Sequence, residues 1–236
     1  MGEYVHSVTL DTAACRGCIT CVKRCPTEAI RVRGGKARIL KERCIDCGEC
    51  IRVCPHHAKR AVTDHLAEME RYRYTIALPA PALYGQFNNL DDAEVVLAGL
   101  LEMGFDEVYE VAAAAELVSD ATRLLLSQGG LERPVISSAC PAVLRLIRVR
   151  FPELLDNVLP LVAPVELAAR DAKRQASRRL GIPASEIGCV FISPCPAKMT
   201  AAKNPLGTGR SDIDLVVSVS EVYPALCSAM RQAGEP

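Results

Sequence analysis

The residues with the clearest chemistry are the cysteines, of which the 236-residue chain has 12. Eight of them lie within the first 54 residues and form two runs of the pattern C-x2-C-x2-C-x3-C-P. The second run begins 29 positions after the first, so the two runs form an internal repeat. In such a run, three close thiolates ligate one cubane 4Fe-4S cluster, and the fourth cysteine ligates the neighbouring cluster.

We therefore predict two 4Fe-4S clusters. The first is held by Cys15, Cys18, Cys21 and Cys54, and the second by Cys44, Cys47, Cys50 and Cys25. Two tetrahedral zinc sites are the alternative, because four thiolates also suit zinc. Zinc sites usually combine paired C-x2-C units, which disfavours that alternative. Residues 1–60 resemble a bacterial two-cluster ferredoxin module, and this resemblance implies one-electron transfer.

Two further cysteines lie in special contexts. Ser137-Ser138-Ala139-Cys140-Pro141 and Ser193-Pro194-Cys195-Pro196-Ala197-Lys198 each follow an apolar segment. We expect both thiols at the carboxyl edge of a parallel sheet, where ligands gather, and a helix that starts at such a cysteine stabilises its thiolate. We interpret the pair as part of a third metal site. The alternative is that each thiol is simply a small apolar group packed in the core. We interpret Cys189 and Cys227 as core residues of this kind.

A cysteine nucleophile is a further alternative for Cys140 or Cys195. Such a nucleophile needs a nearby base, and all four histidines lie at or before position 65. We therefore rank a cysteine-dependent enzyme below a metal site.

The cysteine repeat sets off residues 1–65 as one unit, and the resemblance implies that this unit is an α+β ferredoxin-like two-cluster module. We expect a linker at 66–73. The pattern of apolar residues predicts an α/β domain with a largely parallel sheet at 74–236. That domain looks incomplete at its C-terminal end, because no strand follows the last helix. In the module, strands are expected at 29–32 and 37–40. Beyond it we expect strands at about 74–78, 107–111, 134–137, 188–193 and 213–218. Helices are expected at 91–103, 113–128, 141–150, 164–180 and 220–232.

Charge and hydropathy exclude some partners. Lys and Arg together number 28, as do Asp and Glu, so no net positive charge attracts nucleic acid. No apolar stretch approaches the ~18 residues that a membrane span needs. No secretory signal is evident at the N-terminus, and free cysteines suit a reducing compartment, so we expect a cytoplasmic protein.

The second half resembles the catalytic domain of iron-only (FeFe) hydrogenases, which often follows such a ferredoxin module. The two cysteine motifs above are similar to two of the family's active-site motifs. Further similar stretches are Leu78-Pro79-Ala80-Pro81-Ala82, residues 101–108, residues 151–154 and residues 213–216. The resemblance covers about residues 1–230.

The resemblance implies an H-cluster, which is a cubane joined to a two-iron unit that carries carbon monoxide and cyanide ligands. In the family, this cluster interconverts protons, electrons and H2. Cys140 and Cys195 fall on two of the four cubane ligands, and Lys198 falls on the lysine that pairs with an iron-bound cyanide. The remaining expected cofactor-binding positions are Pro81, Ala82, Ser138 and Pro194. A redox or signalling protein is the implied partner, with H2 and protons as small ligands.

Several positions depart from the family pattern. Ala139 stands where typical members have the proton-relay cysteine, and a methyl group cannot carry a proton. Ser193 replaces a methionine, Ala201 replaces a glutamate, and residues 121–125 lack the usual proton-channel glutamates. These changes resemble the sensory branch of the family, whose members report H2 and turn over slowly.

The family's final cysteine motif, which supplies a cubane ligand and the bridging cysteine, has no counterpart before Pro236. We expect this chain to be truncated, although a partner could complete the site or the site could be incomplete. The resulting hypothesis is a sensory-type, hydrogenase-like protein with two 4Fe-4S clusters and an H-cluster site. The alternative is an electron-transfer or scaffold protein without a two-iron unit.

Overall fold

The computed structural model describes residues 5–88, 90, 92–206 and 209–233. The chain divides into two compact units, each assembled from separate segments. The first unit comprises residues 1–63, 130–160 and 195–209, and the second comprises residues 64–129, 161–194 and 210–236. The division expected from the sequence is linear, whereas the first unit also contains segments 130–160 and 195–209.

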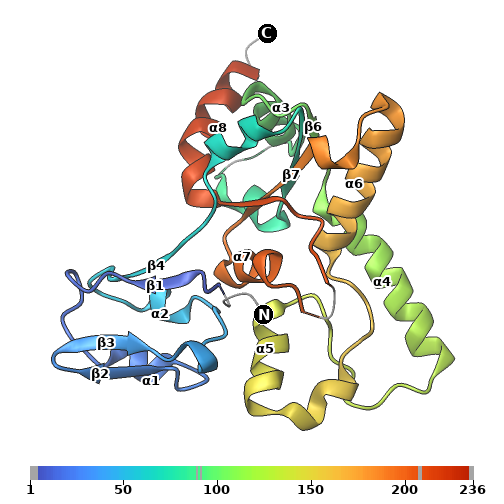
Figure 1. Ribbon diagram of the computed structural model, residues 1–236. Coiled ribbons are helices and arrows are strands. Elements are labelled where there is room, and N and C mark those ends of the chain that lie inside the picture. Colours follow the sequence, from blue (N-terminus) through green and yellow to red (C-terminus); the bar gives the residue numbers. More distant parts are fainter. Residues whose placement is uncertain (1–4, 89, 91, 207–208, 234–236) are drawn as a thin grey trace. The chain divides into compact units, whose positions relative to one another are not determined.

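The N-terminal part of the first unit is a structural repeat. Its elements in chain order are β1 (Val8–Leu10), α1 (Thr20–Arg24), β2 (Ile30–Arg33), β3 (Lys36–Ile39), α2 (Glu49–Arg52) and β4 (Lys59–Ala61). Strand β1 pairs antiparallel with β4, and β2 pairs antiparallel with β3 (Figure 1). The expected strand pair at 29–32 and 37–40 is confirmed as β2 and β3.

The register of the strands follows the 29-residue repeat of the sequence. Leu10 lies opposite Lys59, and Ile39 lies opposite Ile30. Leu10 and Ile39 are 29 residues apart, as are Ile30 and Lys59, so the paired strands of the two halves have equivalent positions.

The remainder of the first unit contains η1 (Lys41–Arg43), α5 (Pro141–Arg150), η4 (Pro152–Asn157) and α7 (Pro196–Lys203). Helix α5 has the predicted bounds. Helix α7 was not predicted, although Pro196 at its first position is a recognised start signal.

The strand predicted at 134–137 is wrong. Ile136 forms only an isolated parallel bridge with Val158 and belongs to no sheet. Its N–H donates to the Asn157 carbonyl at 2.8 Å, and its carbonyl accepts the Leu159 N–H at 2.8 Å. Because these local contacts use both backbone groups, Ile136 does not join the central sheet, and Cys140 does not follow a sheet strand.

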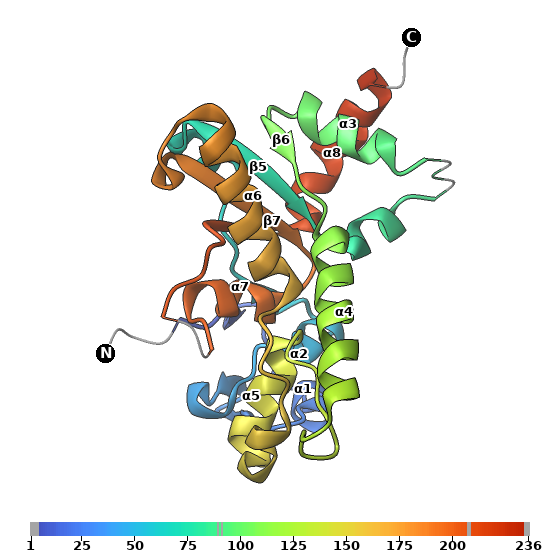
Figure 2. The same ribbon diagram turned by 90° about the vertical axis from the view of Figure 1, so that its right-hand side faces the viewer.

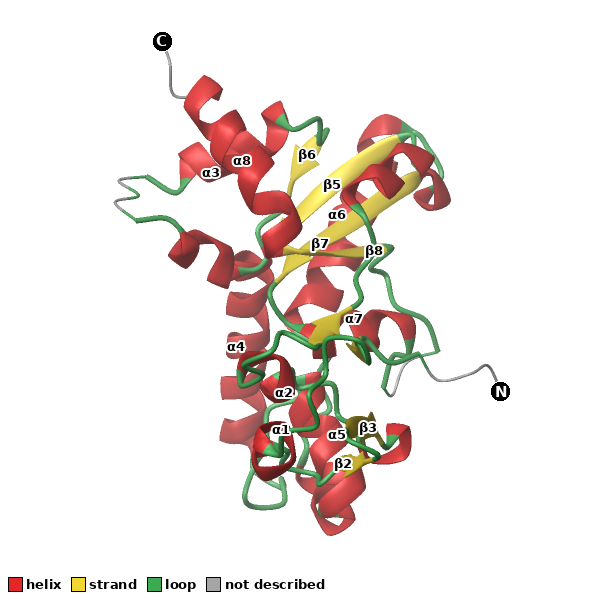
Figure 3. Ribbon diagram, turned by 90° about the vertical axis from the view of Figure 1, so that its left-hand side faces the viewer, coloured by secondary structure: helices red, strands yellow, loops and turns green. Residues whose placement is uncertain are grey.

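The second unit is built on a four-stranded sheet with the order β6-β5-β7-β8. Its strands are β5 (Tyr74–Pro79), β6 (Glu107–Val108), β7 (Ile187–Ser193) and β8 (Leu215–Ser218), and every pair is parallel (Figure 3). All seven residues of β7 are buried, as expected for a parallel strand covered on both faces. The predicted parallel sheet is confirmed, but the strand predicted at 107–111 ends at Val108, because α4 begins at Val111.

Helices cover both faces of this sheet. They are α3 (Glu94–Glu102), α4 (Val111–Gln128), α6 (Pro164–Leu180) and α8 (Val219–Ala233), together with η2 (Leu66–Arg71), η3 (Pro81–Gln86) and η5 (Ala184–Glu186). Helices α3 and α8 pack together on one face, while α6 lies on the other face with α4 against it (Figures 2 and 3). The helix predicted at 91–103 starts at Glu94, and residue 91 lies outside the described residues. Among the described residues, no helix is long and apolar enough to cross a bilayer.

A buried ion pair joins α5 to the cysteine repeat within the first unit. Arg145 on α5 and Asp46 in the Cys44–Cys47 loop have side chains that are 5% and 0% exposed, and Arg145 Nη1 lies 3.4 Å from Asp46 Oδ2. The same oxygen lies 2.8 Å from His6 Nδ1, and the Val8 N–H donates to Asp46 Oδ1 at 3.0 Å. Burial, with a smaller contribution from Arg148, lowers the pKa of Arg145 to about 10. Burial of the Arg145 charge therefore costs desolvation free energy, and the attraction of the Asp46 carboxylate offsets this cost.

Removal of Arg145 tests this link. We expect Arg145→Met to destabilise the first unit by about 3–5 kcal/mol, since it leaves the buried Asp46 carboxylate without this cationic partner. The measurement is the urea midpoint under anaerobic conditions, followed by cluster absorbance and circular dichroism.

Arg148→Met is the matched control, because Arg148 lies one turn further along α5 and is exposed. That change is expected to alter stability by less than about 0.5 kcal/mol. Equal midpoints for the two variants would show that the Arg145–Asp46 pair does not stabilise the unit.

Candidate iron-sulfur centres

All twelve cysteines lie among the described residues, and none is in a disulfide. In the N-terminal repeat, the first two cysteines of each run lie in a loop, and the third lies in the short helix that follows, which is α1 for Cys21 and α2 for Cys50. The fourth cysteine of each run follows that helix, at Cys25 and Cys54. The eight thiols therefore occupy equivalent positions in the two halves of the repeat.

Backbone N–H groups point at several of these sulfurs. The Ala29 N–H donates to Cys25 Sγ at 3.2 Å, and its repeat counterpart, the Ala58 N–H, donates to Cys54 Sγ at 3.4 Å. The N–H groups of Ala37 and Gly17 lower the pKa of Cys15. Such donors stabilise thiolates and tune the potentials of the clusters that thiolates hold.

The four thiols assigned to the second cluster line one cavity. This cavity is bounded by Cys25, Cys44, Cys47 and Cys50, with Val8, Ile30 and Ile39 among its apolar lining. Burial raises the pKa of Cys44 to about 12 and that of Cys50 to about 11. Buried thiols of this kind become thiolates when a metal supplies the compensating charge. The donor set, its spacing and its burial fit a cubane cluster.

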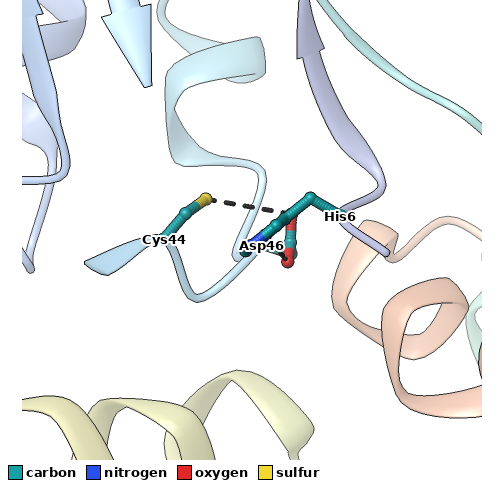
Figure 4. A group of neighbouring side chains, drawn as sticks. All are labelled: His6, Cys44 and Asp46. Carbon is teal, nitrogen blue, oxygen red and sulfur yellow. Dashed lines mark hydrogen bonds and ion pairs between the residues drawn. The ribbon is translucent and has the colours of Figure 1, made fainter. Parts of the chain in front are cut away.

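His6, Cys44 and Asp46 form a compact group that sequence reasoning missed (Figure 4). Their candidate ligand atoms all lie within 4.8 Å of one another. Asp46 already accepts a hydrogen bond from the Val8 N–H and pairs with His6 and Arg145, and Cys44 Sγ donates to Asp46 Oδ1 at 3.8 Å. We therefore interpret the group as a hydrogen-bond network that holds the Cys44 loop, and not as a separate metal site.

Cys140 and Cys195 have closely matched geometries in the first unit. Each is the N-cap residue of a helix that starts with proline, with φ and ψ of −104° and 107° for Cys140 and −109° and 113° for Cys195. Neither thiol caps its own helix. Each cysteine thus lies at the positive end of a helix dipole, where a thiolate ligand is stabilised.

Lys198 connects the two motifs. Its Nζ donates to the Ala139 carbonyl at 2.8 Å, and helices α5 and α7 pack against each other. This hydrogen bond joins the first turn of α7 to the residue that precedes Cys140. Cys140, Cys195, Lys198 and Ala139 thus belong to one unit, and Ser138 in the same unit is half-buried.

Helix α7 also contacts the second cysteine run. Gly48 has a φ of +78°, and a Cβ added there would lie 2.9 Å from Pro196 Cγ. The Ser7 hydroxyl donates to the Pro196 carbonyl at 2.6 Å. Pro196 directly follows Cys195, so the turn between Cys47 and Cys50 lies beside the start of α7.

The remaining predicted positions lie at the carboxyl edge of the sheet in the second unit. Strand β7 ends at Ser193, just before Pro194, and the Ala80 N–H after β5 donates to the Ile192 carbonyl at 3.0 Å. Pro81 and Ala82 then begin η3. The structure therefore brings these two motifs to one sheet edge.

Cys189 lies on β7 and is fully buried, so its prediction as a core residue is confirmed. Its thiol donates to the Ala169 carbonyl at 3.6 Å, and burial raises its pKa to about 12. Cys227 is half-buried on α8 in the same unit.

Comparison with known proteins identifies two families. The C-terminal domain of the iron-only hydrogenase large subunit matches residues 73–230, and the 4Fe-4S dicluster domain matches residues 7–55. A variant of the [FeFe]-hydrogenase HydA1 from Chlamydomonas reinhardtii has a similar fold, with a TM-score of 0.58 at 21% identity over 72% of this chain and 48% of that one.

Curated relatives agree with these matches. The periplasmic [Fe] hydrogenase large subunit of Nitratidesulfovibrio vulgaris is 27% identical over 93% of this chain and 57% of its own length. The cytosolic Fe-S cluster assembly factor nar1 of Aspergillus niger is 28% identical over 58% of this chain and 25% of its own length. The chain thus spans little more than half, or less, of each relative. Because the first family match covers most of the chain, this iron-sulfur protein belongs to the family defined by the C-terminal domain of the iron-only hydrogenase large subunit.

Proposed function

We propose that the protein is a redox protein in which two 4Fe-4S clusters exchange electrons with a hydrogenase-type metal site that includes Cys140 and Cys195. The site reacts with H2 and protons slowly, and the protein reports H2 to a redox or signalling partner in the cytoplasm. When bound, the metal group would supply the chemistry that splits H2 or joins protons and electrons.

The position of α7 carries this proposal. The helix directly follows Cys195, contacts the second cysteine run through Pro196, and contacts the Cys140 motif through Lys198. An electron that leaves a site at Cys195 would therefore have a short route to the cluster held by Cys47 and Cys50.

We assign distinct roles to the residues at this site. Cys140 and Cys195 supply two thiolate ligands, and the positive ends of α5 and α7 stabilise them. Lys198, which the Ala139 carbonyl holds in place, offers a compact positive charge with three donors, and this suits an anionic ligand on the metal. Ser138, which lies in the same unit as these residues, is proposed to line the bound group.

Slow turnover follows from Ala139. A methyl group at the proton-relay position can neither donate nor accept a proton, so proton transfer to the metal site needs another route. Limited turnover suits a protein that reports H2 more than one that consumes it.

The second candidate function is that of a non-catalytic electron-transfer or scaffold subunit without a two-iron unit. Two observations favour it. One is Ala139, and the other is the similarity to the nar1 assembly factor. This candidate keeps the two ferredoxin-type clusters but needs no reaction with H2.

An infrared spectrum separates the two functions. Protein matured anaerobically with the hydrogenase maturation enzymes is expected to show bands of iron-bound carbon monoxide and cyanide. Cys140→Ser and Cys195→Ser are each expected to abolish these bands, because each removes a thiolate ligand of the proposed site.

Cys227→Ser is the control, since Cys227 lies on α8 and is not assigned to any site. It is expected to leave the bands unchanged. Protein that holds both 4Fe-4S clusters but shows no such bands would favour the scaffold function.

Restoring a thiol at position 139 tests the account of slow turnover. We expect Ala139→Cys to raise H2 turnover by about 10- to 100-fold, because a positioned acid-base group contributes about 10²–10⁴-fold where proton transfer limits the rate. The measurement is H2 uptake with an artificial electron acceptor, normalised to the intensity of the infrared bands.

Ala142→Cys adds the same thiol three residues away, on α5 at a position assigned to no site, and serves as the matched control. It is expected to leave turnover unchanged. If fully metallated Ala139→Cys protein is no faster than the parent, loss of the relay does not limit the rate.

A further inference from the structure

The two halves of the cysteine repeat differ at one buried position. Ile30 begins β2 and Lys59 begins β4, and the two positions are 29 residues apart. Ile30 lies opposite Ile39, and Lys59 lies opposite Leu10, which is the counterpart of Ile39. The first half thus has an apolar side chain where the second half has a lysine.

Lys59 is buried as deeply as its apolar counterpart. The residue is 3% exposed and Ile30 is 2% exposed. Lys59 Nζ is buried and has no hydrogen-bond partner among the residues that the structure describes. Burial of an ammonium without a counter-charge is costly, so a negative group is needed beside it.

The residue before Lys59 packs among the cysteines of the first set. Ala58 lies in one buried cluster with Cys15 and Cys21, and its N–H donates to Cys54 Sγ at 3.4 Å. Burial raises the pKa of the Cys21 thiol, and the charge of Lys59 is the largest influence that opposes this rise. Lys59 also lowers the pKa of Cys50, where it is again the largest influence opposing burial, and it contributes to the lowered pKa of Cys15. Two of these three thiols belong to the set assigned to the first cluster.

The repeat supports the same placement. Ile30 lines the cavity bounded by the four thiols of the second set. By the equivalence of the two halves, Lys59 occupies the matching position beside the first set.

We propose that the Lys59 ammonium is a buried counter-charge of the first 4Fe-4S cluster and raises its reduction potential above that of the second cluster. A cubane with four thiolates is anionic and gains one more negative charge on reduction, so a nearby cation stabilises the reduced form. Ile30 gives the second cluster no such charge.

The difference in reduction potential between the two clusters favours electron flow from the second cluster to the first. It rests on the proposed function, in which H2 yields two protons and two electrons at the site with Cys195. The second cluster lies next to that site through Gly48 and Pro196, and each cubane accepts one electron. An electron that reaches the second cluster then moves energetically downhill to the first, which favours H2 oxidation and reporting over H2 production.

The test is a redox titration of the iron-loaded protein followed by electron paramagnetic resonance. Lys59→Met keeps an unbranched side chain and removes the charge. We expect the higher of the two cluster midpoints to fall, with at least a tenfold smaller equilibrium constant for reduction, or about 59 mV for one electron. The lower midpoint is expected to move less, so the gap between the two shrinks.

Two matched variants control for other effects. Arg60→Met removes the same charge from the next residue, whose side chain is 71% exposed, so solvent screens it and little change is expected. Ile30→Met changes the counterpart position without altering charge and is expected to leave both midpoints in place. Lys59→Ile, which copies the side chain of the first half, replaces Lys59→Met if the latter does not retain its clusters.

The outcomes separate the two proposals. Two cubane signals with unchanged midpoints in Lys59→Met would overturn the role of Lys59 while leaving the two-cluster protein intact. An equal shift in Arg60→Met would overturn it as well, because burial would then have no part in the effect. Absence of two cubane signals from the wild-type protein would overturn the proposed function itself.

Discussion

The close approach of Gly48 to Pro196 is the constraint on which the rest of this arrangement depends. Gly48 has a left-handed φ, and any side chain there would collide with the proline ring. The contact sets the start of α7, and therefore Cys195, against the turn between Cys47 and Cys50. Lys198 then ties the same helix to the Ala139 carbonyl beside Cys140. One short helix thus joins the ferredoxin-type repeat to the hydrogenase-type motifs.

The repeat itself uses one backbone for two different chemical environments. Gly17 and Asp46 are counterparts in the repeat, and both have a positive φ. Gly17 packs on the Gly35 backbone. The Asp46 carboxylate instead pairs with His6 and Arg145 and accepts the Val8 N–H. Ile30 and Lys59 are also counterparts, and only Lys59 introduces a buried charge. Asp46 links the second cysteine run to α5 through Arg145. Lys59 places a cation beside the first cysteine set. The two halves of the repeat therefore surround their cysteines with different residues.

Local pattern was sufficient to predict much of this protein. The alternation of short apolar runs with longer amphipathic segments located α5 and α6 to the residue and located the parallel sheet. Helix α7 has only eight residues and little amphipathic pattern, so it was missed. Residues 134–137 are apolar enough for a strand, but hydrogen bonds to residues 157 and 159 occupy Ile136. The Asp46–Arg145 pair spans 99 residues of sequence, and nothing local to either residue reveals it.

The central claim is that H2 reacts at a site with Cys140 and Cys195 and that its electrons reach the N-terminal clusters. The most direct measurement exposes oxidised, matured protein to H2 without any mediator and follows the paramagnetic signals of the reduced cubanes. The account predicts that H2 reduces both clusters in the wild-type protein and neither cluster in Cys195→Ser. Clusters that dithionite reduces but H2 leaves oxidised, in protein that carries the infrared bands of the two-iron unit, would contradict it.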